Sequence, residues 1–518
     1  MSLDLVIRGG TVYDGTGSDG FVADVGIAEG RVVLVGAVES ADAPRLDAAG
    51  LAVAPGFIDI HSHSDYTLLI DPRAASAIFQ GVTTEVVGNC GFGCFPIRDP
   101  TLAARAIYGY SDELPITWSS AGEYFETLAA ARPAVNVLSL VPNGQLRLAT
   151  AGLVDRPATR AECDEMDTLL LESLDAGAWG YSTGLEYAQE SAATEEEITS
   201  LARRAPFYAT HTRRRDAGAA DAVAEAIRTG RSAGTRLQVS HLVPRNGLEE
   251  SRRCVELVEQ AHAAGDDIAF DMHTRTFGLT HLYAVLPGWA LALMPDELER
   301  ALRDPAQRGA MRSHVSILSA GGDWKRVVLL DNDLWPEYAR RDIASIAAER
   351  AQDPLDAVYD LLLGGVGELH SLMAIINAYT PQQQCEAFAH PLCMPGSDAT
   401  TLAPDGPLAS SFFHGAYTWA SWFWRFMVEE RGLLSPQDAV HRLTGMPAAR
   451  IGLQDRGFLR EGARADVVVF EPHGFGERGT TFEPNLPATG MRHVMVNGVA
   501  TLRDGQLTGE RAGRVLLR

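Results

Sequence analysis

The sequence predicts an α/β fold in which a closed (β/α)8 barrel carries a small β-sandwich domain built from both termini. The chain has 518 residues, more than one ordinary hydrophobic core accommodates. Its middle alternates apolar strand-like runs with amphipathic segments, whereas both ends alternate short apolar runs with glycine turns. We therefore expect a barrel at 55–452 and a composite β domain at 1–54 and 453–518.

The two ends of the chain share one pattern. Turn pairs such as Gly9-Gly10 and Asp14-Gly15 separate the first apolar runs, and Asn497-Gly498 follows a similar run near the other end. Short runs separated by such turns are typical of β-sheets. Strands are expected at 5–7, 12–13, 22–26, 31–36, 465–470 and 494–498.

The middle of the chain alternates strands with helices, which indicates a parallel sheet. Helices are expected at 194–204, 217–229 and 252–264. The strand-like runs are 56–60, 83–87, 135–140, 207–211, 237–240, 267–270 and 326–330. A closed barrel suits one unit of this size, and an open, doubly wound sheet is the alternative. Residues 287–325 interrupt the alternation and are interpreted as an insertion on the barrel.

Composition limits the classes of partner. The formal charge of −23 argues against nucleic acid or an anionic membrane as the main partner. No apolar run reaches the roughly 20 residues that a membrane span needs. The start, Met1 to Asp4, lacks the basic and apolar regions of a secretory signal, and six cysteines are few for this length. A cytoplasmic protein is expected, and a homo-oligomer is left open.

The strongest local motif is His61-Ser62-His63, which follows the run 56–60. Residues two apart in a strand point to the same side, so both imidazoles can face one metal ion. A position at the carboxyl end of the first barrel strand would place them where barrel active sites form. An incidental pair of histidines at a strand end is the alternative.

Other metal-ligand types also follow strand-like runs. Cys90 lies in a glycine-rich turn after 83–87, although a buried structural cysteine is the alternative. His211 and His241 each end a run and are separated by about one βα unit. Asp398 follows 394–397 and offers a carboxylate, or alternatively caps a turn.

Together these motifs resemble the amidohydrolase superfamily. The resemblance rests on Pro55-Gly56-Phe57-Ile58-Asp59-Ile60-His61-Ser62-His63, the two later histidines, Gly396-Ser397-Asp398 and the closing segments 443–452 and 462–466. It covers almost the whole chain. Within the superfamily, Gly88-Asn89-Cys90-Gly91 and the segment 180–187 are similar to the D-aminoacylase branch, the N-acyl-D-amino-acid deacylases.

The resemblance implies a metal-dependent hydrolase barrel that cleaves the amide bond of an N-acylated small molecule with one or two Zn²⁺ ions. It assigns a tight metal position to Cys90, His211 and His241, and a second position to His61 and His63. It assigns the role of base to Asp398. Many branches bridge two metals with a carboxylated lysine, but the only lysine here is Lys325, which precedes the run 326–330 and does not lie at the carboxyl end of any predicted strand. This composition agrees with the branch in which a cysteine takes that role.

The sequence departs from the branch where the substrate carboxylate is held. The branch has a lysine shortly after the histidine that matches His241, whereas this chain continues Leu242-Val243-Pro244. In the branch, an acidic residue follows the histidine that matches His211, but residues 211–215 contain no acid. The branch also has an arginine in the segment that here contains His414, and this chain lacks it. The part of the site that would bind the substrate carboxylate is therefore interpreted as built from different residues. The substrate-binding candidates are Arg213, Arg245, Arg275 and His414; a structural role is the alternative for each arginine.

Three other functions compete with amide deacylation. A cyclic-amide hydrolase of the same superfamily would use the same residues. A cysteine hydrolase would use Cys90 as nucleophile with a histidine as base. A non-catalytic barrel scaffold would lose its metal ligands, yet all six candidate residues are present.

Overall fold

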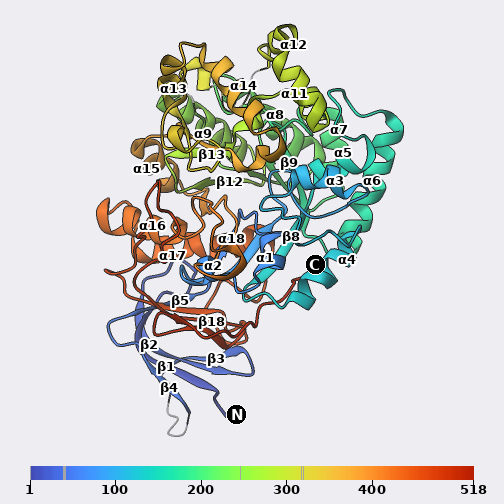
Figure 1. The fold of residues 1–518 in the computed structure, drawn as a ribbon. Coiled ribbons are helices and arrows are strands. Elements are labelled where there is room, and N and C mark those ends of the chain that lie inside the picture. The colour runs from blue at the N-terminus through green and yellow to red at the C-terminus, as the bar shows by residue number, and fades with distance from the viewer. Residues whose placement is uncertain (1, 39–42, 246, 315, 317, 319) are drawn as a thin grey trace.

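The computed structural model describes the whole chain except residues 1, 39–42, 246, 315, 317 and 319. Figure 1 shows a large α/β body with a β domain below it. In that lower domain the blue amino-terminal strands and the red carboxyl-terminal strands lie side by side. The two ends of the chain therefore build one domain, as the sequence predicts.

Eight parallel strands form the barrel, in the spatial order β6-β7-β8-β9-β10-β11-β12-β16. A bridge between Ser62 and Ala399 joins the segments that follow the two outer strands. The amide of Asp398 also donates to the carbonyl of His61 at 2.8 Å. The first and last strands thus meet, which confirms the barrel and excludes the open sheet. The strands are β6 (Phe57–Asp59), β7 (Val82–Val87), β8 (Asn136–Pro142), β9 (Gly180–Gly184), β10 (Phe207–His211), β11 (Arg236–Val239), β12 (Ile268–His273) and β16 (Cys393–Gly396).

Helices cover the outside of the barrel (Figure 1). Several begin at side-chain caps; Thr159, for example, accepts from the amide of Glu162, and the Glu162 side chain accepts from the amide of Thr159. The three helices expected from periodicity correspond to α7, α8 and α9. The helices of the barrel are α1 (Thr67–Ile70), α2 (Ala75–Ile78), α3 (Pro100–Ala103), α4 (Ala121–Ala131), α5 (Asn143–Thr150), α6 (Arg160–Asp175), α7 (Glu195–Ala202), α8 (Ala219–Ala233), α9 (Gly247–Ala263), α15 (Pro381–Ala389), α16 (Trp419–Trp424), α17 (Pro436–Leu443) and α18 (Gly445–Ile451).

A long excursion separates the last two barrel strands, β12 and β16. The segment 287–325, interpreted as an insertion, lies inside it. The strand expected at 326–330 belongs to this excursion, so its assignment to the barrel was wrong: β14 pairs antiparallel with β15. The excursion contains β13 (Phe277–His281), α10 (Gly288–Leu291), α11 (Pro295–Arg303), α12 (Pro305–Met311), β14 (Val327–Leu329), α13 (Ile343–Glu349), α14 (Pro354–Gly364) and β15 (Met373–Asn377).

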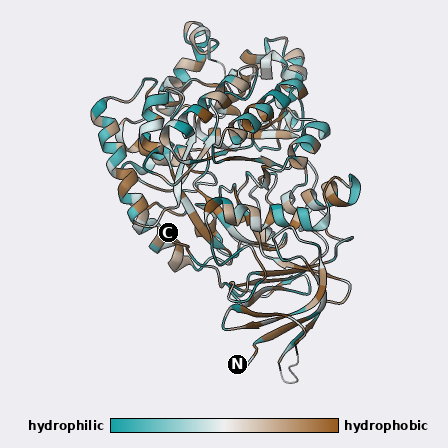
Figure 2. Ribbon diagram, turned by 180° about the vertical axis from the view of Figure 1, so that it is seen from behind, coloured by the Kyte–Doolittle hydropathy of each residue, from teal (hydrophilic) through white to brown (hydrophobic). Residues whose placement is uncertain are grey.

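The terminal domain is one connected sheet of nine strands. Its order is β20-β19-β18-β17-β5-β1-β2-β3, and β4 pairs with β1. Its strands carry many of the apolar residues coloured brown in Figure 2. A hydrophobic core of its own includes Val25, Val53 and Val467, drawn from both ends of the chain. The strands are β1 (Leu5–Val12), β2 (Phe21–Ala28), β3 (Arg31–Gly36), β4 (Arg45–Asp47), β5 (Ala52–Pro55), β17 (Val467–Phe470), β18 (Met491–Val496), β19 (Val499–Arg503) and β20 (Gln506–Leu507).

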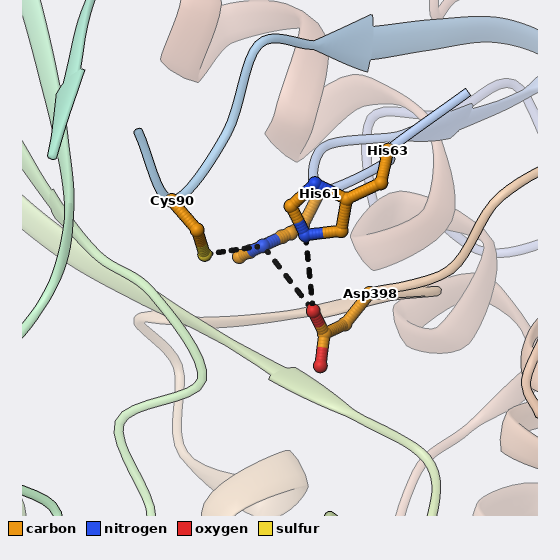
Figure 3. A group of neighbouring side chains, drawn as sticks. All are labelled: His61, His63, Cys90 and Asp398. Carbon is orange, nitrogen blue, oxygen red and sulfur yellow. Dashed lines mark hydrogen bonds and ion pairs between the residues drawn. The ribbon is translucent and has the colours of Figure 1, made fainter. Parts of the chain in front are cut away.

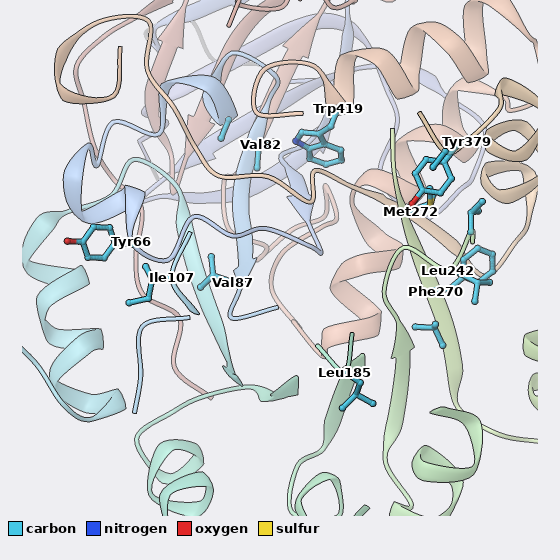
Figure 4. Packing of buried hydrophobic residues seen from close by; sticks show 14 of the residues in the cluster. Tyr66, Val82, Val87, Ile107, Leu185, Leu242, Phe270, Met272, Tyr379 and Trp419 are labelled. Atoms are coloured by element: carbon cyan, nitrogen blue, oxygen red, sulfur yellow. The ribbon is translucent and has the colours of Figure 1, made fainter. Parts of the chain in front are cut away.

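The largest hydrophobic core lies between the barrel strands and the elements packed around them. Figure 4 shows part of it, with Val87 from β7, Phe270 and Met272 from β12, and Trp419 from α16. Burial of side chains of this size contributes roughly 1.5–3 kcal/mol each. Within the described residues, none of the helices combines the length and apolarity needed to cross a bilayer.

Candidate metal-binding active site

The six candidate residues come together at the carboxyl end of the barrel. His61 and His63 follow β6, Cys90 follows β7, and His211 ends β10. The other two, His241 and Asp398, follow β11 and β16. Their side chains meet because the carboxyl ends of parallel barrel strands open onto one face. All six are largely buried, and Asp398, the most accessible, exposes 22% of its side chain.

The ligand-type atoms form two groups that share Cys90. One group comprises His61, His63, Cys90 and Asp398, and the other comprises Cys90, His211 and His241; within each, the potential ligand atoms lie within 4.8 Å of one another. Figure 3 shows the side chains of the first group pointing toward one another. The geometry can therefore hold one or two metal ions.

The shortest distances define the centre of each group. Cys90 Sγ lies 3.2 Å from His61 Nε2 and 3.4 Å from His241 Nε2. His211 Nδ1 lies 3.1 Å from His241 Nε2. Asp398 Oδ1 lies 3.3 Å from His63 Nε2. Several lone pairs thus converge on small volumes.

The backbone at this face adopts conformations that side chains usually avoid. Cys90, His241 and Asp398 have φ angles of 53°, 35° and 46°. Non-glycine residues in this region cost about 1–3 kcal/mol each and cluster at functional sites. Next to Cys90, Gly88 is also left-handed at φ 79°, and a Cβ there would lie 2.3 Å from the carbonyl oxygen of Leu140. The turn that presents Cys90 therefore requires glycine.

Two carboxylates orient the histidines from behind. Asp271 Oδ1 lies 2.9 Å from His61 Nδ1 and accepts from the amide of His241 at 2.8 Å. Glu186 Oε2 lies 2.9 Å from His211 Nε2, and Arg245 forms an ion pair with Glu186. Such partners fix the ring orientation of metal-binding histidines. Neither carboxylate was selected from the sequence, although Glu186 lies within the 180–187 motif and Asp271 at the end of a predicted strand.

Burial controls the protonation of these groups. It raises the pKa of Cys90 to about 11, although His61 opposes this shift. It lowers the pKa of His211 to about 4, against the effect of Glu186. Burial also raises the pKa of Asp398, but the hydrogen bond from His63 and the charge of Arg275 outweigh it and hold that pKa well below its usual value. Burial likewise lowers the pKa of His63 and His241, whereas Cys90 and Asp271 outweigh burial and raise the pKa of His61 well above its usual value. Neutral imidazoles at His63, His211 and His241 and an ionised carboxylate are thus available, whereas a thiolate needs a nearby cation.

A pocket opens beside this cluster. His211, His241 and Asp398 form part of its wall. The remaining lining residues come from the barrel, from the segment before α4 and from the excursion: Tyr108, Tyr187, Arg215, Arg245, His273, Gly278, Leu279, Thr280, Ile376, Tyr379 and Phe413. Residues of β13 and β15, both part of the excursion, therefore form one side of the pocket.

The four substrate-binding candidates have different surroundings. Arg245 lines the pocket but is paired with Glu186. Arg275 pairs with Asp398 Oδ2 at 2.8 Å and lies behind it. Arg275, Arg213 and His414 are not among the residues that line the pocket. Arg213 binds Glu225 and the carbonyls of Ser191 and Ala193, and His414 Nε2 contacts the carbonyl of Thr481.

Comparison with known proteins settles the family. The model of the amidohydrolase family matches residues 46–321 and 393–501, which together make up most of the chain. This chain belongs to the amidohydrolase family. It is accordingly a hydrolase. The stretch between these segments, residues 322–392, is not matched; it includes β14, α13, α14 and β15.

Curated relatives named as deacylases match this chain over its full length. An N-acyl-D-glutamate deacylase of Alcaligenes xylosoxydans xylosoxydans is 34% identical, with 100% of this chain and 97% of the relative covered. An N-acyl-D-aspartate deacylase of that organism is 33% identical over 99% of this chain and 95% of the relative. A D-aminoacylase of the same organism is 31% identical over 99% and 98%.

Solved structures support the same assignment. A D-aminoacylase aligns with a TM-score of 0.81 at 31% identity, and an N-acyl-D-glutamate deacylase from Bordetella bronchiseptica with 0.82 at 30%; both alignments cover 100% of each chain. The second was solved with zinc and a phosphonate inhibitor that mimics the tetrahedral intermediate. A D-aminoacylase with a binuclear metal centre aligns equally well. A dihydropyrimidinase, 17% identical, shares the fold.

Proposed function

We propose that this protein is a zinc-dependent deacylase that hydrolyses the amide bond of small N-acyl-D-amino acids. The observation that carries the proposal is the position of Cys90, whose sulfur belongs to two ligand groups beside the carboxylate of Asp398. The full-length similarity to deacylases of N-acyl-D-glutamate and N-acyl-D-aspartate supports the substrate class.

The donor set and its spacing fit zinc. When two nitrogen or sulfur atoms bind the same zinc ion at normal bond lengths and a tetrahedral ligand–zinc–ligand angle, they lie about 3.3–3.6 Å apart. The separations of 3.1–3.4 Å among Cys90, His211 and His241 are close to this range. Cys90, His211 and His241 would hold the first ion, and His61 and His63 would contribute to a second. Zinc bound in this way lowers the pKa of water to about 7 and polarises a carbonyl group.

The protein's own residues handle the proton. Asp398 Oδ1 would accept a proton from the attacking water as the new C–O bond forms at the amide carbon. Asp398 would then deliver that proton to the amide nitrogen as the C–N bond breaks, which gives a carboxylic acid and a free amine. His63 and Arg275 contact opposite oxygens of this carboxylate and hold it in place.

Metal content and activity, measured together, test this function. We expect about one or two zinc ions per chain, hydrolysis of N-acetyl-D-amino acids, loss of activity on chelation and its return with zinc. Activity that survives removal of all metal would overturn the proposal in favour of a Cys90 thiol mechanism. Hydrolysis restricted to hydantoins or dihydropyrimidines would identify a cyclic-amide hydrolase instead.

A further inference from the structure

The arginines near the active site differ in whether they have a negative partner. Arg213 pairs with Glu225, Arg245 with Glu186 and Arg275 with Asp398. Because each positive charge is already compensated, none of these three is free to balance the charge of a ligand.

Arg215 is the exception among the described arginines that line the pocket. Its side chain is buried, with 5% of the residue exposed. Its Nη2 donates to the backbone carbonyls of His241 at 2.5 Å and Val243 at 2.9 Å, and its guanidinium lies over the ring of Tyr379 at 5.8 Å. In the described part of the chain, it forms no ion pair with a carboxylate.

A buried charge without a partner is costly, so its presence points to a ligand that supplies the opposite charge. The carbonyl contacts use Nη2 alone, which leaves Nε and Nη1 as donors for another acceptor. A carboxylate supplies the missing negative charge and can accept a charge-assisted hydrogen bond from either of these donors. Because His211, His241 and Asp398 line the same pocket, an anion bound to Arg215 would lie beside the reaction centre.

The other walls of the pocket restrict the rest of the ligand. Leu279 and Ile376 come from the excursion, and Tyr108, Tyr187 and Phe413 add aromatic surface. Phe413 packs edge-on against Tyr108 with ring centroids 5.7 Å apart. This surface suits an apolar side chain or acyl group, and the pocket offers no second uncompensated arginine among its lining residues.

We propose that Arg215 binds the free carboxylate of a substrate that carries a single negative charge and an apolar side chain. This inference rests on the proposed deacylase function and narrows its substrate class. Arg215 was not among the substrate-binding candidates taken from the sequence. The expected substrate, with an uncharged side chain, also differs from those of the relatives that act on acidic N-acyl-amino acids.

Matched substrates and one pair of variants test the role of Arg215. Initial rates would be measured on zinc-loaded enzyme for N-acetyl-D-leucine, its carboxamide and N-acetyl-D-glutamate. Arg215→Gln removes the charge inside the pocket, and Arg215→Lys keeps a charge but not the fork. Arg214→Gln is the control, because Arg214 is exposed, belongs to the same loop and undergoes the same charge change.

We expect the native enzyme to prefer N-acetyl-D-leucine over both other compounds. Arg215→Gln should lower kcat/KM for N-acetyl-D-leucine about 30-fold or more, mainly through KM, while the rate on the carboxamide stays within about twofold. Arg215→Lys should recover part of the loss, and Arg214→Gln should behave as native. Equal losses on the acid and the carboxamide would show a structural role and overturn the inference, as would a native preference for N-acetyl-D-glutamate. Absence of hydrolysis of every linear amide would instead refute the deacylase function itself.

Discussion

At the scale of single residues, Cys90 joins the two groups of potential ligands. We expect Cys90→Ala to lose most bound zinc and to lower activity at least 100-fold, because a soft thiolate ligand cannot be replaced by a methyl group. Elemental analysis of the purified variant measures the zinc directly. Cys94→Ala is the control, since Cys94 is also buried but belongs to neither group. Full zinc content in Cys90→Ala would contradict the assignment.

Asp398 is the residue we expect to move the proton. Asp398→Asn removes the basic oxygen while keeping the size of the side chain. We expect kcat to fall about 10²- to 10⁴-fold, the usual contribution of a general acid–base residue. Zinc at Cys90, His211 and His241 should remain, because Asp398 belongs to the other group. A variant that keeps native kcat would remove Asp398 from the mechanism.

Glu186 would act on a bound metal through His211, whose Nε2 lies 2.9 Å from Glu186 Oε2. Glu186→Gln should weaken zinc affinity about 10- to 100-fold, because the carboxylate fixes the ring of this histidine and makes it a better donor. Competition with a zinc chelator measures the change. The variant should regain activity at saturating zinc, whereas a residue needed only for substrate binding would leave zinc affinity unchanged.

At the scale of elements, the turn after β7 determines where Cys90 lies. Gly88→Ala adds the strain of a positive φ and a contact 2.3 Å from the carbonyl oxygen of Leu140. Gly50 also has a positive φ, of 76°, but a Cβ there meets nothing within 4 Å. Gly50→Ala should therefore cost only about 1 kcal/mol, while Gly88→Ala should unfold at a distinctly lower temperature and bind less zinc. Equal thermal shifts for both variants would contradict this account.

The elements show what local pattern can and cannot predict. Barrel strands such as 207–211 were predicted because buried parallel strands are continuous apolar runs. The run 326–330 has the same character, but its pairing with β15 depends on a partner about 45 residues away, which local pattern does not specify. The last barrel strand, Cys393–Gly396, is short and contains Pro395, so its sequence offers little strand character.

The candidate site shows the same division. His61, His63, Cys90, His211, His241 and Asp398 could be selected because ligand-type residues at strand ends must meet on one barrel face. Their order around the metal and the positive φ angles at three of them could not be predicted. Arg213 and Arg215 are indistinguishable in sequence; only the folded chain places Glu225 beside the first and the pocket beside the second.

At the scale of the whole molecule, a buried polar network connects the terminal domain to the barrel. Asp466, just before β17, pairs with Arg456 and accepts from Asn136 of β8 at 3.1 Å and from the amide of Asn497 at 2.6 Å. The Asn497 side chain in turn donates to Asn136 and to the carbonyl of Ala512 at 2.8 Å each. The network thus ties both domains and the end of the chain together.

Removing the centre of this network should destabilise the whole protein. Asp466→Ala removes the nearest carboxylate from the buried guanidinium of Arg456, which then keeps only Asn497 Oδ1 at 2.8 Å and Asp455 at 3.9 Å. Breaking a buried ion pair in this way typically costs about 3–5 kcal/mol. Asp455, whose side chain is 42% exposed, also lies near Arg456, and Asp455→Ala should cost less than about 1 kcal/mol. Unfolding in denaturant, followed by amide hydrogen exchange in the terminal strands β1 and β18 and by residual activity, measures the difference. If the domains depend on each other, both signals should shift together in Asp466→Ala; early exchange in the terminal strands with activity retained would mean that the barrel folds without the terminal domain.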